Sequence, residues 1–63
     1  MTKYYIHNTQ THETSEFNDR SLVVYVRRLC EKSDHDEPQT AAEAWKLYCE
    51  SFRRNWETCW KTD

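Results

Sequence analysis

The stretch that decides the fold lies near the carboxyl end and reads TAAEAWKLYCESFRRNWETCWK, residues 40–61. Thr40 and Glu43 have the spacing of a capping box, in which the threonine is expected to accept from the amide of the third helical residue while the glutamate reaches back to the cap. Beyond this box, apolar residues recur three or four positions apart, which is the period of one helix face. They are Trp45, Tyr48, Cys49, Phe52, Trp56, Cys59 and Trp60. The pattern predicts a single helix over about residues 41–61, with charged side chains on its other side.

A shorter helix is predicted over about residues 19–32, because apolar side chains repeat at helical spacing from Leu22 to Cys30. Asn18 is the expected N-cap, since its short polar side chain can accept from an orphan amide of the first turn. A strand is the competing interpretation of residues 22–26, because LVVYV is apolar and rich in β-branched side chains. The apolar stripe continues past this run, and that continuation favours the helix.

Residues 3–17 have the pattern of a β-hairpin. Two strand-forming runs, KYYIH and ETSEF, flank the polar link NTQTH, which has the length of a hairpin turn with a bulge. Because side chains alternate across a strand, Tyr4 and Ile6 are expected on one face and Tyr5 and His7 on the other.

The turns have to be built without glycine, which the chain lacks. Asn8 or His12 is therefore expected to adopt the left-handed backbone conformation of the hairpin turn. An acidic loop is predicted over residues 33–39, which contain the only proline. Together these elements predict one small α+β domain, residues 1–63, in which a hairpin precedes two antiparallel helices in the order ββαα.

The composition indicates a folded chain. Its 63 residues include three Trp, four Tyr and two Phe, a density of aromatic side chains that disordered chains lack. No run is long and apolar enough to span a membrane, and the first residues show no secretory signal. Three cysteines, an odd number without an export signal, indicate free thiols in a reducing compartment, so the predicted location is the cytoplasm.

The predicted long helix exceeds what so short a chain can cover. A helix of about 21 residues is roughly 31 Å long, whereas a globule of this size is about 27 Å across. We therefore expect an exposed aromatic end and a homodimer formed through the C-terminal helix. The predicted interface has an aromatic centre and an arginine rim: Trp45, Tyr48, Phe52, Trp56, Trp60, Arg53 and Arg54. The alternative is a monomer that hides all three tryptophans in one core.

No cofactor, metal site or catalytic residue is predicted. The cysteines and histidines show neither the Cys-x-x-Cys nor the His-x-x-x-His spacing that delivers two metal ligands from one short segment. A nucleophile needs a neighbouring base inside a pocket, and the chain has no glycine-rich turn to present backbone donors to an oxyanion. The sequence therefore predicts a non-catalytic protein that binds, and thereby regulates, another protein.

Nucleic-acid binding is the alternative function. Tyr4 and Tyr5 on a strand can stack on bases, as aromatic residues do in sheet-based RNA-binding domains. Basic residues line the predicted first helix: Arg20, Arg27, Arg28 and Lys32. The net charge of −2 opposes this function, because domains that bind phosphates normally carry a basic excess.

Two stretches carry a resemblance to a known class of proteins: KYYIHN at residues 3–8 and RSLVVYVRR at residues 20–28. In these stretches and in its length it resembles the small accessory proteins encoded in the early regions of lambdoid phages and prophages. The resemblance covers about half of the chain. It implies a protein of the host cytoplasm that acts by binding host or phage proteins, and it assigns no functional residue.

Overall fold

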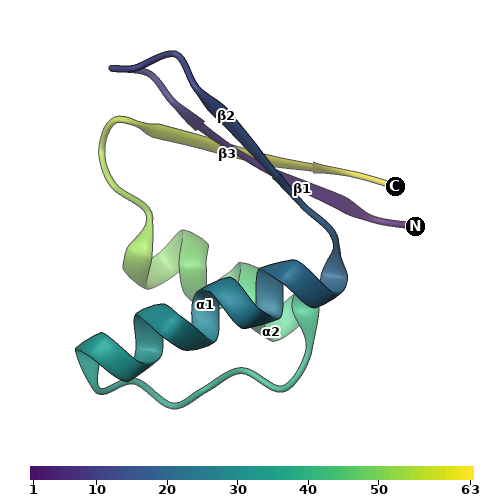
Figure 1. The fold of residues 1–63 in the computed structure, drawn as a ribbon, viewed down its shortest axis with the longest axis vertical. Helices are drawn as coiled ribbons and strands as arrows, with labels where there is room; N and C mark the ends of the chain where they lie inside the picture. Colours follow the sequence, from purple (N-terminus) through teal and green to yellow (C-terminus); the bar gives the residue numbers. More distant parts are fainter.

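A three-stranded antiparallel sheet forms one layer of the molecule, and the helices form the other (Figure 1). The computed structural model describes all 63 residues. Its elements are β1 (Lys3–Asn8), β2 (Thr14–Phe17), α1 (Asp19–Ser33), α2 (Ala41–Leu47), the π-helix η1 (Tyr48–Phe52) and β3 (Glu57–Thr62). β1 lies in the middle of the sheet, which has the order β2-β1-β3. The α+β class is confirmed, but the order ββαα is wrong, because a third strand follows the helices.

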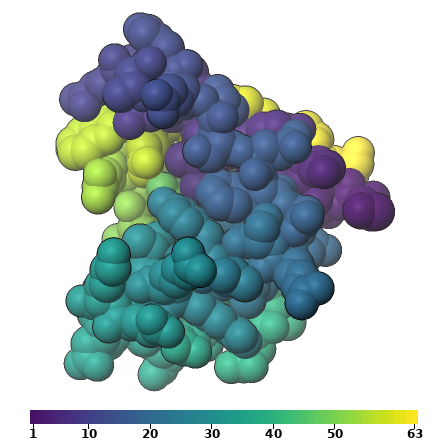
Figure 2. All heavy atoms as spheres, in the orientation of Figure 1, coloured from purple at the N-terminus to yellow at the C-terminus, as the bar shows by residue number.

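The hairpin forms where the sequence predicts it. The side-chain oxygen of Asn8 accepts from the amides of Gln10 and Thr11, at 2.9 and 3.1 Å, and so replaces a glycine in shaping the turn. His12 takes the left-handed position, with φ 64°. This turn is the end of the molecule farthest from the helices (Figure 2). Alternation is also confirmed, since Tyr4 and Ile6 are only 5% and 6% exposed.

The first predicted helix is confirmed, and the strand interpretation of residues 22–26 is wrong. Asn18 caps α1 by accepting from the amide of Ser21 at 2.8 Å, while the Ser21 hydroxyl accepts from the amide of Asn18 at 3.0 Å. Each of these two hydrogen bonds gives a partner to a backbone amide that has none within the helix. The helix ends at Asp34, which adopts the left-handed conformation with φ 60°.

The single helix predicted over residues 41–61 is wrong. Thr40 does cap α2 by accepting from the amide of Glu43 at 3.2 Å, although the Glu43 carboxylate accepts from Gln39 instead of from Thr40. Regular helix lasts only to Leu47; the next turn widens, and the amide of Arg53 donates to the carbonyl of Tyr48 five residues earlier. The backbone of Arg53 is then extended.

Glu57 is the residue that turns the chain from helix to strand. Its Oε1 accepts from the hydroxyl of Tyr48 at 2.7 Å and from the amide of Arg54 at 3.0 Å. The guanidinium of Arg53 donates to the carbonyl of Glu57 at 2.9 Å. These contacts occupy polar groups at the end of the helix, and the chain then returns along β1. The aromatic segment is therefore folded back on the sheet, and the predicted overhanging rod does not exist.

The core lies between the sheet and the helices. Seven buried apolar residues form it: Tyr4, Ile6, Leu22, Val26, Cys30, Ala44 and Tyr48. Trp45 is half-buried at its border, with its ring centroid 5.1 Å from that of Tyr4. All of these side chains lie on one side of the sheet, so its other side is left to solvent. None of the helices is both long and apolar enough to cross a bilayer.

Candidate protein-interaction face

The open face of the sheet is the surface that the helices do not cover (Figure 1). Residues directly opposite each other in antiparallel strands project to the same side. Tyr5 is opposite Glu16 of β2 and Trp60 of β3, and His7 is opposite Thr14 and Thr58. Because Tyr4 and Ile6 point toward the core, these neighbours in the sequence point away from it.

Four rings form what we call the outer aromatic row: Tyr5, His7, His12 and Trp60. The rings of Tyr5 and Trp60 are stacked, with centroids 5.4 Å apart and planes 15° from parallel. The ring of His7 lies 6.4 Å from that of Trp60, and the ring of His12 lies 6.5 Å from that of His7. Trp60 is nevertheless 41% exposed, so the row stabilises the sheet edge and still offers a large aromatic surface to solvent.

Polar side chains surround the outer aromatic row. Threonines border it on both edge strands, and the hydroxyl of Thr14 lies 2.8 Å from Nδ1 of His7. Glu16 of β2 and Lys3 of β1 supply one charge of each sign. An aromatic centre with a polar rim is the usual composition of a protein–protein interface, and this face carries both parts.

The structure separates the residues of the predicted dimer interface. Tyr48 is buried in the core, and Trp45 and Phe52 are half-buried beside it. Trp56 lies in the turn before β3, where the guanidinium carbon of Arg54 is 5.6 Å from its ring centroid. Of the predicted aromatic centre, only Trp60 lies on the open face.

The predicted arginine rim has a structural role. Arg53 donates to the carbonyl of Glu57 through its guanidinium, and Arg54 donates to the Glu57 carboxylate through its amide. Both side chains are exposed, so they lie at the surface of the same turn. Their contacts hold the helix-to-strand reversal and do not surround an aromatic interface.

The predicted nucleic-acid residues also fall on different surfaces. Tyr4 is buried in the core and cannot stack on a base. Tyr5 belongs to the open face, whereas the basic residues lie on α1, in the other layer (Figure 1). They are Arg20, Arg27, Arg28 and Lys32. At 100° per residue, these four positions spread over about 140° of the helix circumference instead of forming one stripe. Arg27 is further engaged by the carbonyl of Pro38, at 3.0 Å. The tyrosine and the arginines do not form one groove.

Sequence reasoning missed the partnership of Tyr5 with Trp60. Trp60 was expected in a helix, so no surface shared with Tyr5 and His7 was predicted. The signal for a strand was present, because Thr58, Trp60 and Thr62 alternate with the inward-facing Cys59. Helical spacing and strand alternation coincide over so short a segment, and only the pairing with β1 distinguishes them.

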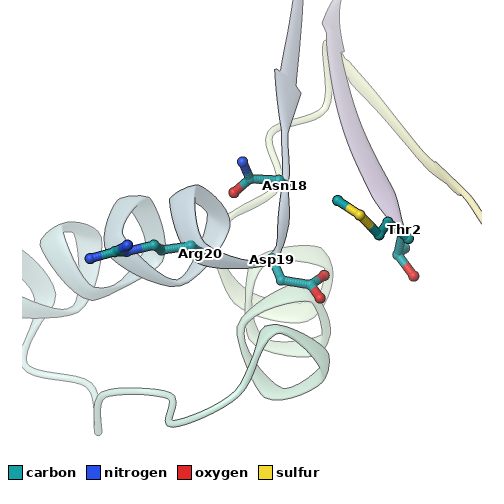
Figure 3. Close-up of a pocket in the computed structure, with 5 residues that line it drawn as sticks. Thr2, Asn18, Asp19 and Arg20 are labelled. Atoms are coloured by element: carbon teal, nitrogen blue, oxygen red, sulfur yellow. The ribbon is translucent and has the colours of Figure 1, made fainter.

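Four hollows lie outside the open face, and two of them adjoin residues described above. One, of about 230 Å³, is formed where the amino terminus meets the start of α1 (Figure 3). There the carboxylate of Asp19 points toward Thr2, and Arg20 points away along the helix. The pKa of the Tyr4 hydroxyl is raised, chiefly by burial and next by the negative charge of Asp19. The other, of about 250 Å³, lies beside Glu57. Its lining residues are Tyr25, Leu29, Tyr48, Ser51, Phe52, Arg54 and Glu57.

The cysteines are free thiols, and their environment makes them poor nucleophiles. Burial raises the pKa of Cys30 and of Cys49, and it raises the pKa of Cys59 to about 11. All three thiols are therefore protonated near neutral pH, whereas the thiolate is the reactive form. No group of three or more His, Cys, Asp or Glu side chains is arranged to hold a metal ion.

Comparison with protein-family models, with curated proteins and with solved structures gives no match for this chain.

Proposed function

We propose that this protein is a non-catalytic interaction module that binds another protein through the open face of its sheet. The observation that carries the proposal is the stacked pair of Tyr5 and Trp60 on a surface that no other part of the chain covers. Tryptophan and tyrosine are the residues most enriched among those that dominate binding energy at protein interfaces. A tryptophan that remains 41% exposed in the folded chain is available for that role.

The outer aromatic row is largely preformed, and this favours binding. The rings of Tyr5, His7 and Trp60 project from hydrogen-bonded strands, and the stack restrains Tyr5 and Trp60. Aromatic side chains with few rotatable bonds lose little conformational entropy when a partner covers them. The row is therefore already close to the form in which a partner would contact it.

The state of the thiols supports a non-catalytic role. Cysteine is the strongest nucleophile among the ordinary side chains at neutral pH, and all three cysteines here have a raised pKa. The resemblance to early-region proteins of lambdoid phages and prophages supports the same proposal, because such proteins usually act by binding host or phage proteins. On this proposal the protein regulates its partner by occupying a surface of it.

Single-stranded nucleic acid is the second candidate for the open face, and one observation favours it. Tyr5 and Trp60 lie on adjacent strands of a bare sheet, as the base-stacking aromatics of RNA-binding sheets do. The net charge of −2 and the position of the basic residues on the opposite layer oppose it. Protein is therefore the partner that the charges favour.

Capture from a lysate of the native host tests the proposal. The immobilised chain is compared with Trp60→Thr, which keeps a strand-forming residue, and with Val24→Thr, which changes a 45% exposed side chain of α1. We expect the same protein to be captured by the wild type and by Val24→Thr, and to fall at least about ten-fold with Trp60→Thr, the loss that one interface hot spot causes.

Two results would contradict the proposal. One is equal capture by the wild type and Trp60→Thr, both shown by circular dichroism to be folded. The other is captured material that consists of oligonucleotides and disappears after nuclease treatment. This result would mean that the open face binds nucleic acid instead of protein.

A further inference from the structure

The free edge of β3 has a hydrogen-bonding pattern that can be derived from the register. The amide of Thr9 donates to the carbonyl of Trp56 at 2.8 Å, just before the first paired residues of β3. In antiparallel strands, hydrogen-bonded pairs alternate with non-hydrogen-bonded pairs. Counting by two from Thr9 and Trp56, the residues that bond to β1 are Thr58, Trp60 and Thr62. The intervening residues turn their N–H and C=O groups toward the free edge.

Glu57 is the first of these outward-facing residues, and its backbone is already engaged. Its amide donates to the carbonyl of Arg54 at 3.0 Å, and its carbonyl accepts from Arg53 at 2.9 Å. Two residues remain, Cys59 and Lys61. Each presents one backbone donor and one backbone acceptor along the same edge of the sheet.

The opposite edge of the sheet is less suited to pairing. β2 has four residues, whereas β3 has six. Natural proteins protect an edge strand by shortening it, by charge, by proline or by a bulge. Neither strand contains proline, and both carry charge, Glu16 in β2 and Glu57 and Lys61 in β3, so the edges differ chiefly in length.

We propose that β3 pairs antiparallel with β3 of a second copy of this chain, about a two-fold axis at Trp60. This register places Cys59 of each copy opposite Lys61 of the other, so the two outward-facing residues of each strand exchange all their backbone hydrogen bonds. Four interchain hydrogen bonds result, two for each Cys59–Lys61 pair. Of the symmetric registers of this edge, this one uses the backbone groups of both Cys59 and Lys61.

The neighbouring symmetric registers are weaker. Centring the axis on Cys59 brings Lys61 opposite Glu57, whose backbone groups already have partners. Centring it on Lys61 places two lysines directly opposite each other, which is destabilising across a pair of strands. The two-fold axis at Trp60 instead gives Cys59 and Lys61 free partners and places no two lysines opposite each other. It brings Glu57 opposite Asp63 of the second copy only where the paired strands end.

Pairing in this register changes the open face. The two sheets become one sheet of six strands, in which the two Trp60 residues form a non-hydrogen-bonded pair with Cα atoms about 4.5 Å apart. The outer aromatic row of one copy then continues into that of the other. This inference goes beyond the proposed function, because the edge can pair whether or not the face binds another protein.

The size of the contact sets how strong the association is. Two six-residue strands bury much less than the about 800 Å² per partner of a stable interface. We therefore expect a reversible dimer whose population rises with concentration, and not an obligate one.

Amide hydrogen exchange, measured from micromolar to millimolar protein concentration, tests the β3–β3 pairing in the unmodified chain. We expect the amides of Cys59 and Lys61 to become at least about ten-fold more protected as the concentration rises. The amides of Thr14 and Glu16, which face the free edge of β2 by the same counting, serve as the internal control and stay unchanged. Fast exchange of Cys59 and Lys61 at every concentration would overturn the proposal.

A pair of proline variants, followed by sedimentation equilibrium, tests the same contact. Lys61→Pro and Glu16→Pro each remove an outward-facing amide from an edge strand, where proline is tolerated. We expect Lys61→Pro to remain monomeric at all concentrations and Glu16→Pro to dimerise like the wild type. Dimerisation of Lys61→Pro, or its loss in Glu16→Pro, would contradict the assignment of the edge. If Lys61→Pro does not fold, the N-methylated Lys61 backbone, made by chemical synthesis, replaces it.

The two proposals fail separately. If Lys61→Pro is monomeric and still captures the partner protein, binding of the partner does not require the dimer. A wild-type chain that stays monomeric, with capture still dependent on Trp60, would overturn the dimer alone.

Discussion

Tyr4 and Tyr5 are neighbours in the sequence and occupy opposite sides of the same strand. Tyr4 is 5% exposed and lies against Trp45 under the helices, whereas Tyr5 is stacked on Trp60 on the open face. The inner face of the sheet therefore supplies the apolar burial that holds the fold together, and the outer face presents aromatic surface to solvent. One strand of six residues serves both purposes because its side chains alternate.

The largest effect is expected when the two tyrosines are truncated in turn. Tyr4→Ala removes a buried ring and should lower the free energy of unfolding by about 3–5 kcal/mol, enough to unfold so small a domain. Tyr5→Ala removes a half-exposed ring and should cost only about 1 kcal/mol. Urea unfolding followed by circular dichroism measures both values. Equal costs would show that the two faces do not differ as described.

The next effect concerns the turn that brings β3 back to the sheet. Glu57→Ala leaves the hydroxyl of Tyr48, a residue only 2% exposed, without its acceptor and should cost about 2–3 kcal/mol. Tyr48→Phe introduced into that variant removes the unsatisfied hydroxyl and should recover part of the loss. A further loss of stability in the double variant would show that the contact does not hold the reversal.

About half of the architecture could be predicted from the sequence, because local signals specify it. Asn18 as a cap, His12 in the left-handed turn and the alternation of Tyr4 and Tyr5 depend on neighbours a few residues away. The fate of residues 53–62 depends instead on Glu57 and on pairing with β1 at the other end of the chain. The apolar spacing of these residues suits a helix, but their pairing with β1 makes them a strand. The candidate face depends on that pairing.

A smaller effect is expected from the stack on the open face. A double-mutant cycle with Tyr5→Thr and Trp60→Thr isolates the interaction between the two rings, because threonine keeps a high strand propensity. We expect a coupling energy of about 0.5–1.5 kcal/mol, the range for aromatic pairs. A coupling energy of zero would mean that Trp60 does not restrain Tyr5, and the preformed surface would lose its physical basis.

No effect at neutral pH, and one only under alkaline conditions, is expected from the thiol of Cys59. The pKa of Cys59 is raised from its ordinary value of 9.0 to about 11, chiefly by burial, so the unfolded chain releases this proton first. Stability should therefore be unaffected by this group below pH 9.0 and should fall as the pH rises from there to about 11. The urea midpoint of Cys59→Ala should fall less over this window than that of the wild type. Identical pH profiles would contradict the burial of this thiol.

The position of β3 can be tested most directly by nuclear Overhauser contacts between backbone protons. Ile6 and Cys59 form a non-hydrogen-bonded pair, in which the Cα atoms are about 4.5 Å apart and the Hα protons point at each other. We expect strong Hα–Hα cross-peaks between Ile6 and Cys59 and between Tyr4 and Lys61. An unbroken series of sequential amide–amide cross-peaks from Phe52 to Trp60, as in a continuous helix, would contradict the strand and with it the open face and its free edge.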